Sequence, residues 1–170
     1  MKILILGSSG NIGSHLYKNL LNQNIFIIGA STKECDLLNI AQLRKFIKSH
    51  PKFDILIFLV GLAHSKGKNK DINDFDKINY KTLDNLISII KSEKKVPKKI
   101  IFASTISVYG ERYKQIKYDE DLDCKPFSPY ALTKLKAENF LLKEFQEKSW
   151  ILRFAPVYSD NFLLNIIRRT

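Results

Sequence analysis

The sequence is poor in the residues that build disulfide frameworks and metal sites. It has two cysteines and three histidines in 170 residues, and Cys35 and Cys124 have the spacing of neither a disulfide framework nor a zinc site. The longest apolar stretch, residues 55–63, is about half a membrane span, and the opening apolar run is too short for a signal-peptide core. These absences predict a cytoplasmic protein with reduced thiols, no metal ion and no membrane partner.

Acidic residues are scarce relative to basic ones. The chain has 28 Lys and Arg against 17 Asp and Glu, a formal net charge of +11, which invites a nucleic-acid interpretation. The lysines are scattered, however, with clusters at residues 66–70 and 94–99, and no basic stripe interleaved with aromatics accompanies them. We therefore expect no nucleic-acid partner, because a basic surface equally suits a cofactor or substrate that carries phosphates.

What the sequence does have is a turn rich in glycine at its start. An apolar run of strand length, residues 1–6, is followed by Gly7, Gly10 and Gly13 and by a helical pattern from Asn11. Gly7 permits a tight turn, Gly10 lets backbone approach a pyrophosphate, and Gly13 lets the helix pack closely. Phosphates would then lie at the helix N-terminus, although a purely structural turn has the same glycines.

The end of the second predicted strand, residues 25–29, is where dinucleotide-binding proteins distinguish their cofactors. An Asp or Glu there binds the 2′-hydroxyl of NAD, whereas this chain has Ser31 and Lys33. A hydroxyl and a cation suit a 2′-phosphate, so the pattern favours NADP over NAD. The alternative is a solvated loop.

Further buried strands are predicted at residues 54–61, 100–103 and 150–154. Open parallel sheets bind ligands beyond the carboxyl ends of their strands, which places Val60 and Gly61 at the site. Hydroxyl residues 104–105 leave the next strand, where they could hold a substrate oxygen or simply form a turn.

Two predicted helices carry polar residues beside this edge. The first begins at Asn73 and ends before Pro97, and a buried Asn79 on it would either brace a neighbouring strand or serve the site. The second begins with Ser128 as its cap and carries Tyr130 and, one turn later, Lys134. An adjacent ammonium would lower the pKa of a tyrosine and suit it to acid-base catalysis.

Together these motifs resemble the extended short-chain dehydrogenase/reductase family, the group of nucleotide-sugar epimerases, dehydratases and reductases. They occur in family order over essentially the whole chain. They are the Gly7-Gly10-Gly13 turn, Asp36-Leu37, Val60-Gly61-Leu62, Asn79, Ser104-Thr105, Val108-Tyr109-Gly110, Tyr130 with Lys134, and Arg153 with Pro156-Val157-Tyr158.

The resemblance implies a role for each matching position. The pyrophosphate of NADP or NAD would lie against Gly7, Gly10, Asn11, Ile12 and Gly13, its adenosine ribose against Ser31 and Lys33, and its adenine against Asp36 and Leu37. The cofactor cleft would be lined by Val60, Gly61 and Asn79, and the nicotinamide would be flanked by Pro156 and Val157.

The resemblance also assigns the catalytic roles. Thr105 would bind the reacting oxygen of a nucleotide sugar, and Tyr130 would transfer the proton of that oxygen. Lys134 would lower the Tyr130 pKa and hold the nicotinamide ribose.

The implied fold is a Rossmann-like, doubly wound parallel sheet in three α/β/α layers, with strand order 3-2-1-4-5-6 and a very short third strand before Asp36. Residues 1–170 would form one NAD(P)-binding domain that carries the catalytic motif. The family's C-terminal substrate-binding region would be absent, in a fragment or a natural truncation. The helices at residues 73–94 and 129–148 would form the contact of a homodimer.

Departures from the family pattern narrow the function. Family 4,6-dehydratases have an Asp-Glu pair where this chain has Ile106 and Ser107, so the acid-base agents of water elimination are missing. That leaves a nucleotide-sugar epimerase or a carbonyl reductase. The alternative is a dinucleotide-binding regulatory module, or inactive truncated homologue, without catalysis.

Overall fold

The computed structural model describes residues 1–62, 71–110 and 118–158, and within them a five-stranded parallel sheet forms the centre. Its strand order is β2-β1-β3-β4-β5. The strands are β1 (Lys2–Leu6), β2 (Phe26–Ala30), β3 (Ile55–Phe58), β4 (Lys99–Thr105) and β5 (Ser149–Phe154). The inner strands β1, β3 and β4 carry buried Ile, Leu and Phe, as a parallel sheet requires. The prediction of a buried strand at residues 150–154 is wrong, because β5 lies at the end of the strand order with Trp150 56% and Leu152 40% exposed.

The observed order agrees with the predicted doubly wound sheet except at its predicted third strand. Between Ala30 and Ile40, a described segment, the backbone forms turns and no strand. The amides of Glu34 and Cys35 both donate to the Ser31 carbonyl at 3.2 and 3.0 Å, and the Leu38 amide donates to the Asp36 carboxylate at 2.9 Å. Because these groups are paired locally, they are not available to a sheet ladder.

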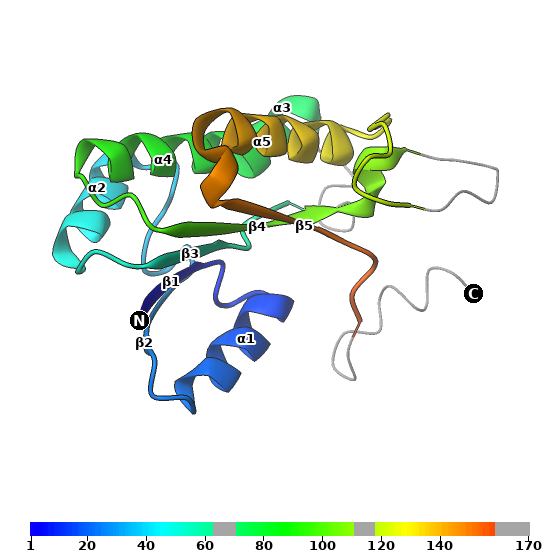
Figure 1. Cartoon of the computed structure of the whole chain (residues 1–170). Helices are drawn as coiled ribbons and strands as arrows, with labels where there is room; N and C mark the ends of the chain where they lie inside the picture. Colours follow the sequence, from blue (N-terminus) through cyan, green and yellow to red (C-terminus); the bar gives the residue numbers. More distant parts are fainter. Residues whose placement is uncertain (63–70, 111–117, 159–170) are drawn as a thin grey trace.

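Helices cover both faces of the sheet, so the predicted three layers are present (Figure 1). Helix α1 (Asn11–Leu21) lies on one face, where its Leu16 and Leu20 pack against Ile3, Ile5 and Ile57. The other face is covered by α2 (Ile40–Ser49), α4 (Thr82–Ser92) and α5 (Pro129–Phe145), and it holds the larger apolar core. The short helix α3 (Ile72–Asp76) lies on that same side.

The long helix predicted from Asn73 is divided. After α3 the chain makes a π-helical segment, η1 (Lys77–Lys81), before α4 begins, and α4 ends at Ser92. Single π turns inside helices are frequent at functional sites. Here the π segment contains the fully buried Asn79.

The helix caps follow the sequence closely. The predicted cap Ser128 accepts a hydrogen bond from the Ala131 amide, with Pro129 as the first helical residue. Asn39 caps α2 in the same way by accepting from the Gln42 amide, and α2 begins at Ile40. Short 3-10 segments, η2 (Ile106–Tyr109) and η3 (Gln146–Lys148), follow β4 and α5.

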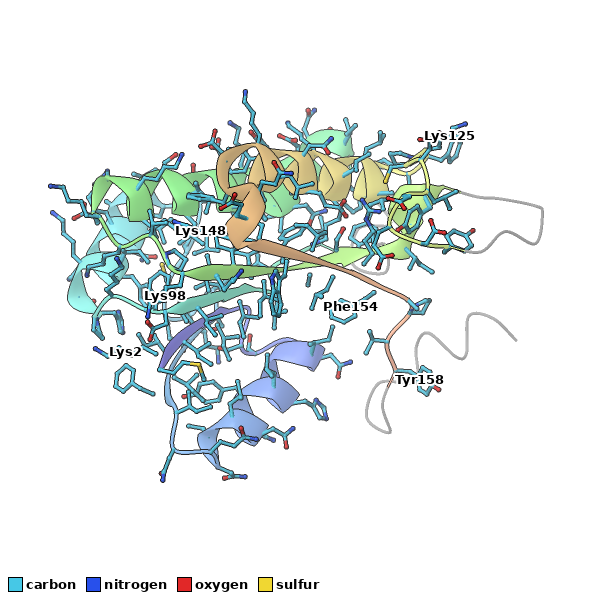
Figure 2. The ribbon with its side chains drawn as sticks, in the orientation of Figure 1. Lys2, Lys98, Lys125, Lys148, Phe154 and Tyr158 are labelled. Carbon is cyan, nitrogen blue, oxygen red and sulfur yellow. The ribbon has the colours of Figure 1, made fainter. Side chains whose placement is uncertain are left out.

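The strands all begin at one edge of the sheet, its amino edge, and all end at the opposite, carboxyl edge. Lys2 and Lys98 lie at the amino ends of the strands, and Phe154 and Tyr158 lie toward the opposite, carboxyl end (Figure 2). All the strands are parallel, so the chain leaves each of them at this carboxyl edge.

In the described part of the chain, no helix has the length and apolar character needed to cross a membrane.

Candidate active site at the carboxyl edge of the sheet

The glycine turn joins β1 to α1 by close backbone packing. Gly7 has φ +87°, a conformation that favours glycine, and its amide donates to the Ala30 carbonyl at 2.8 Å. A Cβ on Gly13 would lie 2.1 Å from the Gly7 carbonyl oxygen. The turn therefore depends on both glycines, as the sequence predicts. Gly7 is needed because of its positive φ, and Gly13 because a side chain there would collide with the backbone.

The N-terminus of α1 fits a phosphate group. Gly10 is the N-cap in extended conformation, and the first turn, which starts with Asn11 and Ile12, has no side-chain cap and no acidic residue. The first amides of a helix are unpaired donors at the positive end of its dipole. A pyrophosphate can therefore meet these amides without competing with a carboxylate.

The tip of β2 contains an acid that the sequence interpretation missed. The Ser31 amide and hydroxyl both donate to the Glu34 carboxylate, at 2.7 and 2.6 Å, and the Lys33 amide donates to the Ser31 hydroxyl oxygen at 3.2 Å. These hydrogen bonds from Ser31 lower the pKa of Glu34. Sequence spacing gave one signal for this, because Ser and Glu three residues apart in a turn can bond to each other.

This geometry changes which of the two cofactors, NAD or NADP, the tip of β2 favours. The predicted 2′-phosphate subsite consists of a hydroxyl and a cation, but in the structure that hydroxyl is bonded to a carboxylate. An anion at the tip of β2 repels a 2′-phosphate and accepts a hydrogen bond from a ribose hydroxyl.

Asp36 and Leu37 lie beyond this tip in different environments. The Asp36 side chain is exposed, and one of its oxygens accepts from the Leu38 amide. The Leu37 side chain is part of the main core, and its carbonyl accepts from Asn85 at 3.0 Å. Contact with adenine stays a prediction for both residues.

The chain after β3 lies between the glycine turn and α5. A Cβ on Gly7 would lie 3.2 Å from the Val60 nitrogen, and one on Gly61 would lie 3.4 Å from Asn79 Oδ1 and 3.5 Å from Lys134 Nζ. The structure thus brings Val60 and Gly61 to the place expected of them. Any side chain on Gly61 would meet the Lys134 ammonium.

Asn79 braces this part of the chain. Its Oδ1 accepts from the Leu62 amide at 2.6 Å, and its Nδ2 donates to the Leu62 carbonyl at 3.3 Å and to Thr133 Oγ1 at 3.0 Å. The side chain is fully buried, and these bonds satisfy it. Of the two roles left open by the sequence, the structure gives it the bracing role, and direct contact with a cofactor stays a prediction.

The predicted catalytic residues converge from β4 and α5. Thr105 is the last residue of β4, and its side chain is hydrogen-bonded to that of Tyr130 at the start of α5. The Thr105 hydroxyl also lies 3.2 Å from Ser107 Oγ. Lys134 is one turn further along α5 and only 3% exposed, with its Nζ 4.4 Å from the centre of the Phe102 ring.

The titration of Tyr130 differs from the prediction. Its pKa is raised, because burial outweighs the effect of the hydrogen bond with Thr105. The predicted lowering of this pKa by Lys134 is therefore wrong for this arrangement. Burial also lowers the pKa of Lys134 to about 8, against an opposing effect of Glu138, so the lysine is still mainly charged at neutral pH.

The buried Glu138 and its partner Arg153 form a charged pair that spacing alone did not reveal. Arg153 donates from Nη2 to the Glu138 carboxylate at 2.7 Å, and Ser104 donates to the same carboxylate. Spacing indicates only that Glu138 lies near the site, because Tyr130, Lys134 and Glu138 recur every four residues and share one face of α5. The Arg153 partner could not be assigned without the sheet register.

Pro156 and Val157 follow β5 at the carboxyl edge. Pro156 is exposed and Val157 half-buried in the described structure. Their position after the strand agrees with the predicted place, and contact with a nicotinamide stays a prediction.

Comparison with known proteins gives a consistent picture. The model of the NAD dependent epimerase/dehydratase family matches residues 3–168. An uncharacterized UDP-glucose epimerase of Bacillus subtilis (strain 168) is 31% identical over 186 residues, covering 93% of this chain and 57% of that protein. A dTDP-D-glucose 4,6-dehydratase of Homo sapiens is 28% identical over 185 residues, covering 94% of this chain and 52% of that protein.

A solved structure adds to this similarity. The UDP-glucuronic acid 4-epimerase of Bacillus cereus in complex with NAD is 30% identical, with a TM-score of 0.75, over 93% of this chain and 58% of that one. The chain thus spans about half the length of the relatives that it matches.

Proposed function

Since the chain belongs to the NAD dependent epimerase/dehydratase family, we propose that it is the cofactor-binding and catalytic part of a nucleotide-sugar epimerase or carbonyl reductase. The proposal covers the reaction type, a hydride transfer at a sugar carbon, and the class of substrate. In this proposal Tyr130 is the acid or base.

The observation that carries the proposal is the convergence of three side chains from separate elements. Thr105 at the end of β4 is hydrogen-bonded to Tyr130, and Lys134 follows one turn later next to Gly61. The glycine turn that fits a pyrophosphate lies against the neighbouring chain segment at Val60. This is the arrangement expected if a dinucleotide bound along the edge ends beside the Tyr130 hydroxyl.

Each side chain has a defined chemical task in this arrangement. The nicotinamide, when bound, supplies or accepts the hydride. The Tyr130 hydroxyl gives or takes the proton of the reacting sugar oxygen, and the Thr105 hydroxyl holds that oxygen in place. Lys134, mainly charged at neutral pH, binds the ribose hydroxyls of the cofactor.

The cofactor of the proposed enzyme is NAD or NADP. The sequence favours NADP through Ser31 and Lys33, whereas the Glu34 carboxylate bonded to Ser31 favours NAD. Titration with both reduced cofactors separates the two.

Two features bear on the choice of reaction. Dehydratases are among the relatives, so overall similarity does not separate the reactions. At the site, however, Ile106 and Ser107 supply no carboxylate beside Thr105. Water elimination needs acid and base groups at that point, so we exclude a 4,6-dehydratase from the proposal.

A second candidate is a dinucleotide-binding module without catalysis. The raised pKa of Tyr130 favours it, because a phenol that holds its proton at neutral pH is a poor base. Cofactor binding without turnover of any nucleotide sugar, in a protein of the relatives' length, would support this candidate over the enzyme.

The test has a binding step and a turnover step. We expect calorimetric titration of this chain with NADH and NADPH to give saturable binding. In a protein of the relatives' length, Tyr130→Phe should reduce turnover of the nucleotide sugar by roughly 10²- to 10⁴-fold while leaving cofactor affinity in place. Turnover that survives this substitution would remove Tyr130 from the reaction, and failure to bind either cofactor would contradict the proposal.

A further inference from the structure

Glu138 is a buried acid to which the proposed reaction assigns no role. It lies on α5 one turn after Lys134 and is 0% exposed. A carboxylate removed from water is strongly unfavourable unless hydrogen bonds and opposite charges surround it. Its presence in a helix that already bears the site's lysine therefore needs an explanation.

The carboxylate is bonded from two different strands. Ser104 on β4 donates to Oε1, and Arg153 on β5 donates to Oε2 from Nε at 3.1 Å and from Nη2 at 2.7 Å. Arg153 in turn donates from Nη1 to the Tyr109 hydroxyl at 2.8 Å, and that hydroxyl donates to the Asp119 carbonyl at 2.8 Å. One acid thus connects α5 with β4, β5, η2 and the segment at Asp119.

Each strand residue that donates to Glu138 precedes a proposed site residue by one to three positions. Ser104 directly precedes Thr105, and Arg153 precedes the segment with Pro156 and Val157. In the parallel register Ser104 and Arg153 are also paired with each other. The carboxylate therefore fixes the ends of two adjacent strands against the helix that carries the proposed catalytic side chains.

We propose that Glu138 is a positioning residue: its carboxylate, held by Ser104 and Arg153, sets the placement of Thr105 and Lys134. This role rests on the proposed function of the site and deepens it. Glu138 touches neither substrate nor cofactor in the proposal and acts through its neighbours.

Several charged or titratable groups face this carboxylate. Lys134 lies on its own helix, Arg153 on β5 and Tyr109 on η2, and Cys124 acts on Arg153 electrostatically. Of these, Lys134 reports best on Glu138, because burial lowers the lysine's pKa to about 8 while Glu138 opposes that lowering. Loss of the negative charge should therefore make Lys134 release its proton at lower pH.

The first experiment follows the Lys134 side chain by NMR across a pH titration of the full chain. In Glu138→Gln we expect its titration midpoint to fall by about 1 pH unit or more. Glu93→Gln is the control, because Glu93 is likewise ion-paired to an arginine, Arg44, at 2.6 Å, but it is only partly buried and follows α4 near the amino edge of the sheet. A midpoint that is unchanged in Glu138→Gln overturns the proposal.

The second experiment separates positioning from mere stability. Replacing a buried ion pair by apolar residues often leaves stability unchanged, so the double variant Glu138→Leu with Arg153→Met should keep a cooperative thermal transition. We expect this variant to show the lowered Lys134 midpoint and roughly tenfold weaker NADH or NADPH binding. It also serves as the test if Glu138→Gln does not fold.

The outcomes are distinguishable from failure of the proposed function. A wild-type chain that binds neither cofactor contradicts the proposed function, while the Lys134 midpoint still decides the role of Glu138. A folded double variant with wild-type midpoint and wild-type affinity shows a network that is structural only, and overturns the positioning role.

Discussion

The two sides of the candidate site are built in different ways. On the α1 side the contacts are backbone atoms: Gly13 leaves space for the Gly7 carbonyl, and the first amides of the helix have no side-chain cap. On the α5 side the contacts are between charges: Lys134 and Glu138 are buried on the helix, and Arg153 on β5 donates to the Glu138 carboxylate. The first side needs small residues at fixed spacing, and the second needs a tertiary arrangement that satisfies each charge.

The α1 side should fail most severely at Gly13. In Gly13→Ala the new Cβ would lie 2.1 Å from the Gly7 oxygen and 2.9 Å from Ser8 Cα, both backbone atoms. We expect a loss of about 3 kcal/mol in the free energy of unfolding, measured by chemical denaturation, together with loss of cofactor binding. Gly10→Ala is the control, because its Cβ has only one close neighbour, at 3.3 Å, and it should fold normally.

The α5 side should show the opposite behaviour at Lys134, where removal of a charge stabilises the protein. The folded-state pKa of about 8 lies below the ordinary 10.5, so charged Lys134 disfavours folding below pH 8, and this cost disappears as the pH rises toward 10.5. We expect Lys134→Met to raise the free energy of unfolding by about 3 kcal/mol at pH 7.

The gain from Lys134→Met should shrink between pH 8 and pH 10.5. Denaturation of wild type and variant at pH 7 and pH 10 checks both points, and an equal gain at the two pH values would contradict the assigned pKa shift. Lys136→Met is a suitable control, because that lysine is half-exposed on the same helix.

The two sides also differ in their expected partners. Exposed leucines occur on both, Leu21 at 54% on α1 and Leu132 at 41% and Leu142 at 38% on α5. The homodimer that the family resemblance predicts would use the helices at residues 73–94 and 129–148, on the α5 side. Leu132→Asp with Leu142→Asp should convert the dimer to a 19.7 kDa monomer in light scattering, because a charge is unfavourable in an apolar contact.

Leu21→Asp tests the α1 side and should leave the dimer intact. A wild-type chain that is monomeric at all concentrations, or dissociation in Leu21→Asp alone, would contradict the placement of the contact.

The smallest effect is expected at the tip of β2. Glu34→Gln removes an exposed carboxylate, and we expect the affinity for NADPH relative to NADH to rise by roughly two- to fivefold at low salt. Lys33→Gln should change that ratio in the opposite direction. An unchanged ratio in both variants, measured by calorimetry, would show that neither side chain meets the adenosine ribose.

The sequence predicted the parts of this protein that depend on local pattern. Spacing predicted three such parts: the strand, glycine turn and helix at the start, the cap at Ser128, and the shared helix face of Tyr130 and Lys134. The structure confirms the placement of all three. The strand order was implied by the family resemblance, and the five observed strands follow it. The predicted third strand was wrong, because turn hydrogen bonds around Ser31 and Asp36 satisfied the backbone locally.

Only the tertiary structure decided how the charges are arranged. The burial of Lys134 and the choice of the strand that supplies the partner of Glu138 depend on contacts between residues distant in sequence. The hydrogen bond between Ser31 and Glu34 depends on the path of a turn. The pKa values of Tyr130 and Lys134 follow from that burial rather than from their spacing. Spacing determines which side chains share a face, and packing determines how much water is left around them.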